Sequence, residues 1–196
     1  TIRSAAFESM CPGNAPSDML LDYHRSVAAG GIGMTTVAYA AVTQSGLSFD
    51  RQLWMRPEII PGLRRLTDAI HAEGAAAGIQ LGHCGNMSHK SICGCMPVGA
   101  SSGFNLYSPT FVRGLRADEL PEMARAYGRS VNLAREAGFD SVEIHAGHGY
   151  LISQFLSPST NHRKDEFGGS LQNRMRFMDM VMEEVMKAAG SDMAVL

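Results

Sequence analysis

The chain has 196 residues, of which 45% are hydrophobic and 18% are charged, a composition that predicts a globular domain with a sizeable core and excludes a disordered or fibrous chain. Seventeen lysines and arginines against 19 acidic residues give a net charge of -2, so the sequence predicts no basic surface for nucleic acid or an anionic membrane. The expected partner is therefore a small molecule.

Helical periodicity occurs four times, and each time a glycine ends it before a short β-prone run. In the first helix Ser17 is the expected N-cap, and Leu20, Tyr23 and Val27 form the expected apolar face. The four predicted helices end at Gly30, Gly74, Gly138 and Gly190, and the strands after the first three cover residues 32–37, 76–81 and 139–145.

The fourth helix carries Met175, Met178, Met182 and Met186 at helical spacing. Methionine is flexible enough to form an adaptable binding surface, but this spacing is also that of a helix face packed on a sheet. We expect the methionines to pack in the core.

Strands that alternate with helices predict parallel pairing, either in an open doubly wound α/β sheet or in a (β/α)8 TIM barrel. A barrel needs about 250 residues and eight units, whereas this chain supplies four units and the start of a fifth strand. We therefore expect residues 1–196 to be the N-terminal half of a single TIM barrel, cut at both ends. Long segments follow the strands at residues 38–60, 82–118 and 146–170, where barrel enzymes build their active sites.

The densest group of candidate residues lies between residues 142 and 177. His145 is expected to end a strand on the side opposite its apolar neighbours, and His148 and Tyr150 follow in one short loop. Two imidazoles can donate hydrogen bonds to one substrate oxygen, and a nearby phenol can supply a proton. The residues alone leave three interpretations open: activation of a carbonyl or nitro group, a metal site in a hydrolase or lyase, and structural hydrogen bonding.

Three segments occur in an informative order: AAFESMC at residues 5–11, GIQLGHCG at 78–85, and GFDSVEIHAGHGYLISQFLSPSTNHRKDEFGGSLQNRMRF at 138–177. Together they resemble the first strand and loop, the third-strand motif and the signature segment of the Old Yellow Enzyme and 2,4-dienoyl-CoA reductase family of NADH:flavin oxidoreductases. The resemblance implies a TIM barrel that binds FMN and takes electrons from NADH or NADPH. It further implies hydride transfer from reduced FMN to the activated C=C bond of an α,β-unsaturated carbonyl or a similar electrophile.

The resemblance also implies roles for individual residues. His145 and His148 would hold the electron-withdrawing oxygen of the substrate, and Tyr150 would protonate the neighbouring carbon. The amide of Gln80 offers a donor and an acceptor that match the flavin pyrimidine. The other expected flavin contacts are Ser9, Met10, Cys11, Tyr39, mainly through its backbone, and His145.

The sequence departs from the family at Asn86, where an arginine is usual, and at Pro12, near which related enzymes often carry an aromatic residue. The segment after the third strand also combines histidines with cysteines. The Cys-x-Cys spacing there lacks the two intervening residues of common metal sites, so no metal is expected. These residues are His83, Cys84, His89, Cys93 and Cys95.

No apolar run approaches the roughly 18 residues of a membrane span, and the N-terminus has no signal-peptide core. Four cysteines without framework spacing fit a reducing compartment, so a cytoplasmic location is expected. In the family, the loops that hold the FMN phosphate come from the second half of the barrel. We therefore expect the parent protein to be active and residues 1–196 alone to be inactive. The parent protein could also form a homo-oligomer.

Overall fold

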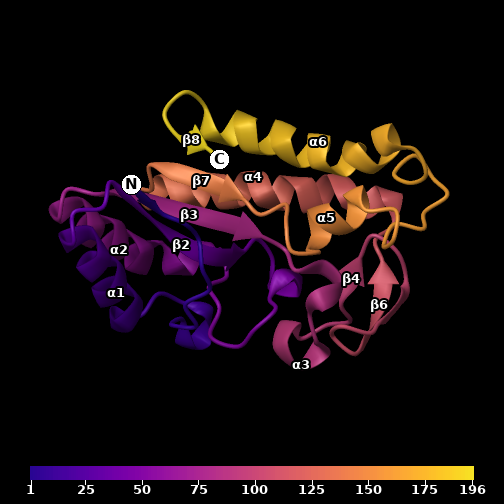
Figure 1. Ribbon diagram of the computed structural model, residues 1–196, viewed down its shortest axis with the longest axis horizontal. Coiled ribbons are helices and arrows are strands. Elements are labelled where there is room, and N and C mark those ends of the chain that lie inside the picture. The colour runs from indigo at the N-terminus through magenta and orange to yellow at the C-terminus, as the bar shows by residue number, and fades with distance from the viewer.

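A computed structural model describes residues 1–196 and contains a five-stranded sheet whose neighbouring strands are all parallel (Figure 1). The strands lie in the order in which they occur along the chain, so every connection leads to the neighbouring strand. The predicted α/β class with a parallel sheet is therefore confirmed. The strands are β1 (Ile2–Arg3), β2 (Met34–Ala41), β3 (Ala76–Gly82), β7 (Ser141–Ile144) and β8 (Ala194–Val195).

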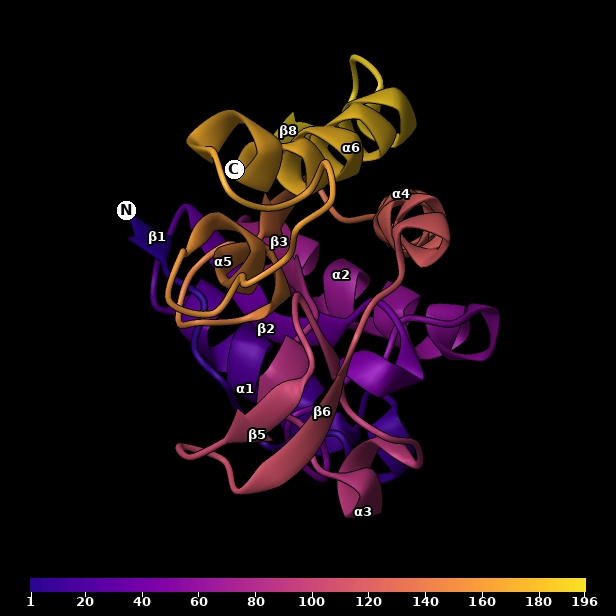
Figure 2. The same ribbon diagram turned by 90° about the vertical axis from the view of Figure 1, so that its right-hand side faces the viewer.

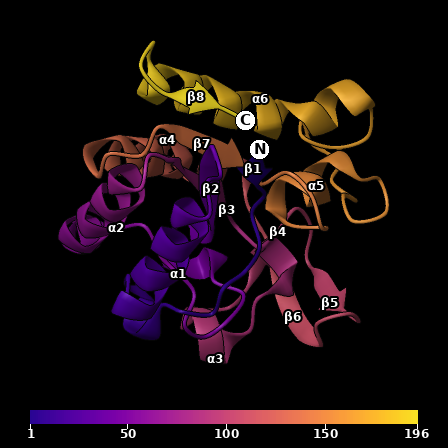
Figure 3. The ribbon, with the colours of Figure 1, turned by 60° about the vertical axis from the view of Figure 1, so that its left-hand side comes forward.

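A long helix follows each of the first four of these strands. Helix α1 packs beside α2, and α4 beside α6 (Figure 3). Ser17 caps α1 as predicted, because its hydroxyl accepts a hydrogen bond from the amide of Leu20. These helices are α1 (Asp18–Ala29), α2 (Ile60–Ala72), α4 (Leu120–Glu136) and α6 (Leu171–Ala189).

The face of α6 that packs in the core differs from the predicted one. Phe177, Val181 and Val185 are fully buried, whereas Met175 is 39% exposed and Met186 52% exposed. The methionine spacing correctly predicts a helix. The buried stripe, however, begins at Phe177, which lies about 100° from Met178 around the helix. Met178 and Met182, the remaining members of the methionine stripe, lie half-buried.

The buried face of α1 also differs from the prediction. Leu20 and Ala28 pack in the core together with His24, whereas Tyr23 and Val27 are only half-buried. The His24 ring is accommodated because its Nδ1 lies 2.8 Å from Thr35 Oγ1 on β2 and its Nε2 lies 3.3 Å from Glu8 Oε1. A hydrogen-bonded ring therefore takes the place that an apolar side chain was expected to fill.

The carboxyl ends of the strands carry additional elements that the sequence did not predict. A second, three-stranded sheet and two short helices gather at this end of the molecule (Figure 2). They are α3 (Lys90–Cys93), β4 (Val98–Gly99), β5 (Gly103–Asn105), β6 (Thr110–Gly114) and α5 (Leu151–Leu156). Single 3₁₀ turns occur at Pro12–Asn14, Gln44–Gly46, Pro57–Ile59, Gly85–Met87 and Ala117–Glu119.

The strand boundaries shift modestly from those predicted. The first strand lies before the 5–11 segment, which is a loop, and β2 extends beyond the expected end to include Tyr39. Strand β8 begins where a fifth strand was expected. None of the helices is both long enough and apolar enough to span a bilayer.

Candidate active site

The candidate site lies on the sheet face opposite the helices. A Cβ atom on Gly78 would lie 2.8 Å from Ser141 Oγ and 3.2 Å from Thr36 Oγ1, so these side chains share one face with it. Two residues further along β3, the alternation places Gln80 on this same face. The face therefore carries small side chains low on the sheet and larger polar ones near the strand ends.

Gln80 is held by a partner on the neighbouring strand. It lies opposite Glu143 in the register of β3 and β7, and its Nε2 donates a 2.5 Å hydrogen bond to Glu143 Oε1. This bond fixes the plane of the amide and leaves the amide oxygen and the second N–H for another molecule. Glu143 was not singled out from the sequence.

The three predicted catalytic side chains come together immediately after β7. Nε2 of His145 lies 3.2 Å from Nδ1 of His148, and the ring centroids of His145 and Tyr150 are 4.8 Å apart. The ring of Tyr39 lies against this group, with centroids 5.3 Å from Tyr150 and 5.8 Å from His145. Four residues singled out from the sequence thus form one aromatic cluster.

Burial sets the ionisation of this cluster. It lowers the pKa of His145 to about 4, with the neighbouring His148 adding to the effect, so His145 is neutral at pH 7. Burial likewise raises the pKa of Tyr150, which therefore keeps its proton. The cluster consequently offers the neutral ring of His145, which can polarise an oxygen, and a phenol that can give a proton.

Tyr39 contributes its ring but not its hydroxyl. Its phenol group hydrogen-bonds to the carbonyl of Gly46 at 2.9 Å and to Ser48 Oγ at 3.0 Å. Burial raises the pKa of Tyr39 well above its ordinary value. A contact of Tyr39 with a cofactor on the open face would therefore involve its backbone.

The turn that carries His148 has an unusual backbone conformation and is held by hydrogen bonds from α5. His148 has a φ of 55° and Gly149 a φ of 69°, so two consecutive residues lie in the left-handed region. The buried amide of Gln154 on α5 donates a 2.7 Å hydrogen bond to the Gly149 carbonyl. The same amide bonds to the carbonyl of Cys84 and to both the backbone and the side chain of Asn86.

Gln154 thus joins the turn after β7 to the turn after β3. Gln154 could not be identified from the sequence, since nothing local separates a buried glutamine from an exposed one in a short helix. The contact also gives Asn86, which departs from the family, a structural role at the Gln154 amide.

The N-terminal loop reaches the same end of the sheet. Ser9 is exposed with a φ of 56°, Met10 is half-buried, and Cys11 is 4% exposed with a pKa raised to about 12 by burial. Glu8 anchors this loop, because its two carboxylate oxygens accept hydrogen bonds from Arg3 Nη1 at 3.0 Å and from the amide of Ala38 on β2 at 3.2 Å. Glu8 was not identified from the sequence.

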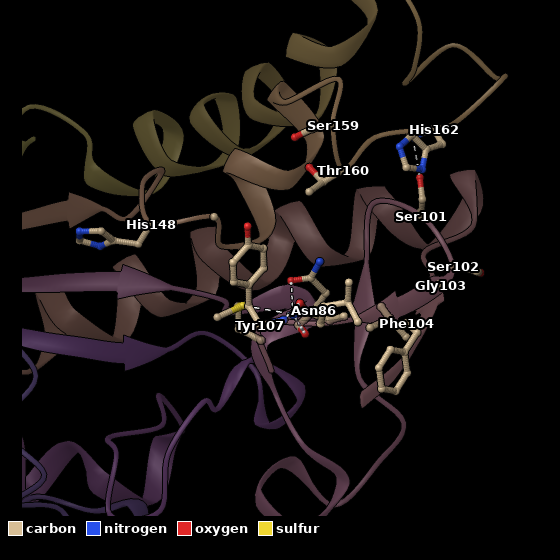
Figure 4. A pocket seen from close by; sticks show the side chains of 15 residues that line it. Asn86, Ser101, Ser102, Gly103, Phe104, Tyr107, His148, Ser159, Thr160 and His162 are labelled. Carbon is tan, nitrogen blue, oxygen red and sulfur yellow. Dashed lines mark hydrogen bonds between the residues drawn. The ribbon is translucent and has the colours of Figure 1, made fainter. Parts of the chain in front are cut away.

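A cavity of about 540 Å³ opens beside the histidine pair. Figure 4 shows His148 at one end of it and His162, hydrogen-bonded to Ser101, toward the other. Phe104 and Tyr107 of the β5–β6 hairpin line the same cavity and are 50% and 94% exposed. The cavity is therefore adjacent to the donors and has a partly aromatic wall.

The cysteines and histidines after β3 do not form a metal site. No group of three His, Cys, Asp or Glu side chains within residues 1–196 is arranged to hold a metal ion. Cys84 is buried and contacts the Leu47 carbonyl, and the fully buried His83 bonds to Ser45 and to the amide of Gly85. These side chains stabilise the turns around the site through hydrogen bonds.

Comparisons with known proteins find relatives that cover most of this chain. The sequence profile of the NADH:flavin oxidoreductase / NADH oxidase family matches residues 4–196. The 4,4'-dithiodibutanoate disulfide reductase of Rhodococcus erythropolis is 41% identical over 99% of this chain and 48% of its own length. The NADPH dehydrogenase of Bacillus subtilis is 38% identical over 83% of this chain and 48% of its own length.

A solved structure shows the same fold. The Old Yellow Enzyme homologue from Zymomonas mobilis superimposes with a TM-score of 0.91 at 29% identity, covering 99% of this chain and 57% of that one. The chain thus spans about half the length of the curated relatives that it matches. The family resemblance predicted from the three sequence segments is confirmed.

Proposed function

Because the chain belongs to the NADH:flavin oxidoreductase / NADH oxidase family, we propose that it is part of an FMN-dependent reductase that acts on the activated C=C bond of an α,β-unsaturated carbonyl or a similar electrophile. The observation that carries this proposal is the convergence of His145, His148 and Tyr150 beside the Gln80 face of the sheet. Family membership also favours this function over a metal-dependent hydrolase or lyase, in which the two histidines would be ligands.

We extend the proposal to the architecture of the whole protein. Five parallel strands in chain order, with the long helices on one face, are the arrangement expected for the first half of a (β/α)8 barrel. The 57% coverage of the Zymomonas mobilis structure supports this view. Residues 1–196 would then form the N-terminal half of one FMN-binding domain.

The residues on the open face fit a flavin. The Gln80 amide, oriented by Glu143, presents an acceptor and a donor side by side, which is the pattern that a pyrimidine edge requires. The loop of Ser9, Met10 and Cys11, the backbone of Tyr39 and the ring of His145 would complete the contacts of this half. Bound FMN, reduced by NADH or NADPH, would supply the hydride.

The protein side chains would orient and activate the substrate. Nε2 of His145 and Nδ1 of His148 lie within hydrogen-bond distance of each other, at 3.2 Å. An oxygen bound beside them would replace this mutual hydrogen bond and accept one N–H from each ring. Their hydrogen bonds would draw electrons toward that oxygen and make the conjugated carbon a better hydride acceptor. Tyr150, which retains its proton, would then protonate the adjacent carbon.

Spectroscopy of the full-length protein tests this function. We expect a flavin absorbance in the purified protein that bleaches on anaerobic addition of NADPH and returns when cyclohexenone is added. Tyr150→Phe should bleach normally but reoxidise more slowly, about 10²- to 10⁴-fold if the phenol is the general acid. A colourless protein would refute the proposal, and a reduced flavin that cyclohexenone does not reoxidise would refute its assignment to activated C=C bonds.

The same experiment can include a second oxidant. The Rhodococcus erythropolis relative is named for the reduction of a disulfide, so 4,4'-dithiodibutanoate is a suitable alternative acceptor. If the disulfide reoxidises the reduced flavin and the enone does not, the protein is still a flavin-dependent reductase, but its substrate is a disulfide.

A further inference from the structure

Cys93 and Cys95 form a close pair of thiols outside the aromatic cluster. Their sulfur atoms lie 3.8 Å apart, and Cys93 Sγ also donates to the carbonyl of Cys95 at 3.2 Å. Gly94 between them ends α3 with a φ of 75°, in the left-handed conformation that glycine adopts without strain. The sulfur atoms would need to approach by less than about 2 Å to reach the length of a disulfide bond.

The two thiols differ in how they are held. Cys93 is 2% exposed and packs in a small apolar cluster with Tyr39 and Cys84, whereas Cys95 is exposed. A reagent in solution can therefore reach the Cys95 sulfur first. Cys93 is positioned beneath it as the second thiol of the pair.

A cavity of about 610 Å³ lies next to Cys95. Its wall includes Arg113 and Arg116, which are paired with Glu119 and Asp118, so positive and negative groups alternate there without a dominant sign. Such a surface suits a small zwitterionic molecule that carries both ammonium and carboxylate groups better than it suits a simple anion. The cavity volume is within the usual range for small-ligand sites.

From this geometry we propose that Cys93 and Cys95 are a thiol–disulfide exchange site that reduces small zwitterionic disulfides. The Cys95 thiolate attacks one sulfur of the disulfide, which forms a mixed disulfide and releases the other half as a thiol. Cys93, as its thiolate, then attacks the Cys95 sulfur, which closes the Cys93–Cys95 disulfide and releases the second half as a thiol. Two electrons pass from the protein to the disulfide, and the two cysteine protons end on the released thiols.

Peptide mapping of the full-length protein tests the site without involving flavin reduction. The protein, with its FMN oxidised and no NADPH present, is treated with glutathione disulfide, then denatured, alkylated and digested with trypsin. The positions of lysine and arginine place each cysteine region in its own peptide: residues 4–25 contain Cys11, 66–90 contain Cys84, and 91–113 contain both Cys93 and Cys95. The oxidation state of Cys93 and Cys95 is therefore measured separately from that of Cys11 and Cys84.

The expected product is peptide 91–113 with an internal disulfide, two hydrogens lighter and without alkyl groups. Cys11 and Cys84 should be alkylated only after denaturation, because burial raises the pKa of each to about 12 and keeps them unreactive. Burial and Cys93 also raise the pKa of Cys95, so the closure rate should increase as the pH rises above 7.

Two variants separate exchange from simple oxidation. Cys95→Ser changes an exposed side chain and should leave Cys93 reduced, whereas Cys93→Ser should trap glutathione on Cys95 as a stable mixed disulfide. Full alkylation of both thiols in the treated wild-type peptide, or a mixed disulfide on wild-type Cys95 that does not close, would overturn the proposal. Both results are independent of whether the flavin site reduces an enone.

Discussion

The segments that follow β7 and β3 both reach the candidate active site, but they are fixed in different ways. After β7 the chain needs only residues 145–150 to place two histidines and a tyrosine before α5 begins. After β3 it makes a long excursion over residues 83–116 that contains α3 and the β5–β6 hairpin. In the first segment His145 is buried and Tyr150 is half-buried, although residues 147–149 are exposed, whereas the hairpin exposes several large apolar side chains.

This contrast indicates a division of labour. The short segment places His145 at the strand end and holds the turn of His148 through the Gln154 amide, and such fixed placement of donors is what electrostatic activation of a substrate requires. The long segment forms the wall of the 540 Å³ cavity, where a change of side chain alters shape without disturbing the sheet. We expect catalytic rate to depend on the first segment and substrate choice on the second.

The largest expected effect comes from His145→Ala in the short segment. Removing one donor to the substrate oxygen should slow reoxidation of the reduced flavin by cyclohexenone about 10²- to 10³-fold. Stopped-flow absorbance of the full-length protein measures this rate. His71→Ala is the matched control, since His71 lies on α2 and pairs with Asp140 at the other end of the sheet. Equal reoxidation rates in the two variants would show that His145 does not take part in catalysis.

The next effect is on stability and concerns the base of the long excursion. Arg163, whose side chain is 9% exposed, donates hydrogen bonds to the carbonyls of Ala100 and Leu115 and pairs with Asp165. Arg163→Ala should lower the free energy of unfolding by about 3 kcal/mol, because both carbonyls and the carboxylate lose their partner.

Urea denaturation measures this loss. Arg125→Ala is the control, because Arg125 is 51% exposed and pairs with Glu122 on the surface of α4, where ion pairs contribute less than about 1 kcal/mol. Similar losses in the two variants would mean that Arg163 does not anchor the excursion.

The same contrast explains which features the sequence could predict. The strands, the long helices and the histidine pair follow from local patterns, since a residue at a strand end is placed by the strand itself. Gln154 and Glu8 could not be found this way, because their partners are the turn at Asn86 and the backbone of Ala38, distant in sequence. The β5–β6 hairpin was also missed, since its strands are short and carry exposed aromatic residues.

The methionine prediction failed for a different reason. The period of 3.6 residues identifies a helix but not which of two neighbouring apolar stripes faces the core. On α6 the stripe of Phe177, Val181 and Val185 lies beside the methionine stripe, and the stiffer aromatic and β-branched side chains take the buried position.

A smaller effect is expected where the excursion leaves β3. Burial lowers the pKa of His83 to about 3, compared with about 6.5 in an unfolded chain. The unfolded state therefore binds more protons below pH 6.5, and the stability that neutral His83 provides is lost as the pH falls from 6.5 toward 3. At pH 5 this loss is about 2 kcal/mol relative to pH 7.

His83→Gln tests this contribution, because glutamine can keep an acceptor for Gly85 and a donor for Ser45 but does not titrate. Urea denaturation at pH 7 and pH 5 should show a stability difference about 2 kcal/mol smaller in the variant than in the wild type. An unchanged difference would indicate that His83 can be protonated without unfolding.

The smallest effect is expected at the tip of the hairpin. Tyr107 is 94% exposed, so Tyr107→Ser should change the free energy of unfolding by less than about 0.5 kcal/mol. Its ring nevertheless lines the cavity beside His148, where an aromatic contact contributes about 1 kcal/mol. The KM for a phenyl-substituted enone should therefore rise about fivefold, while that for cyclohexenone stays unchanged. Phe111→Ser is the control, because Phe111 is exposed on the same hairpin but does not line the cavity. If both variants change the two KM values equally, the hairpin does not select substrates. The proposal that the long segment determines substrate choice would then be wrong.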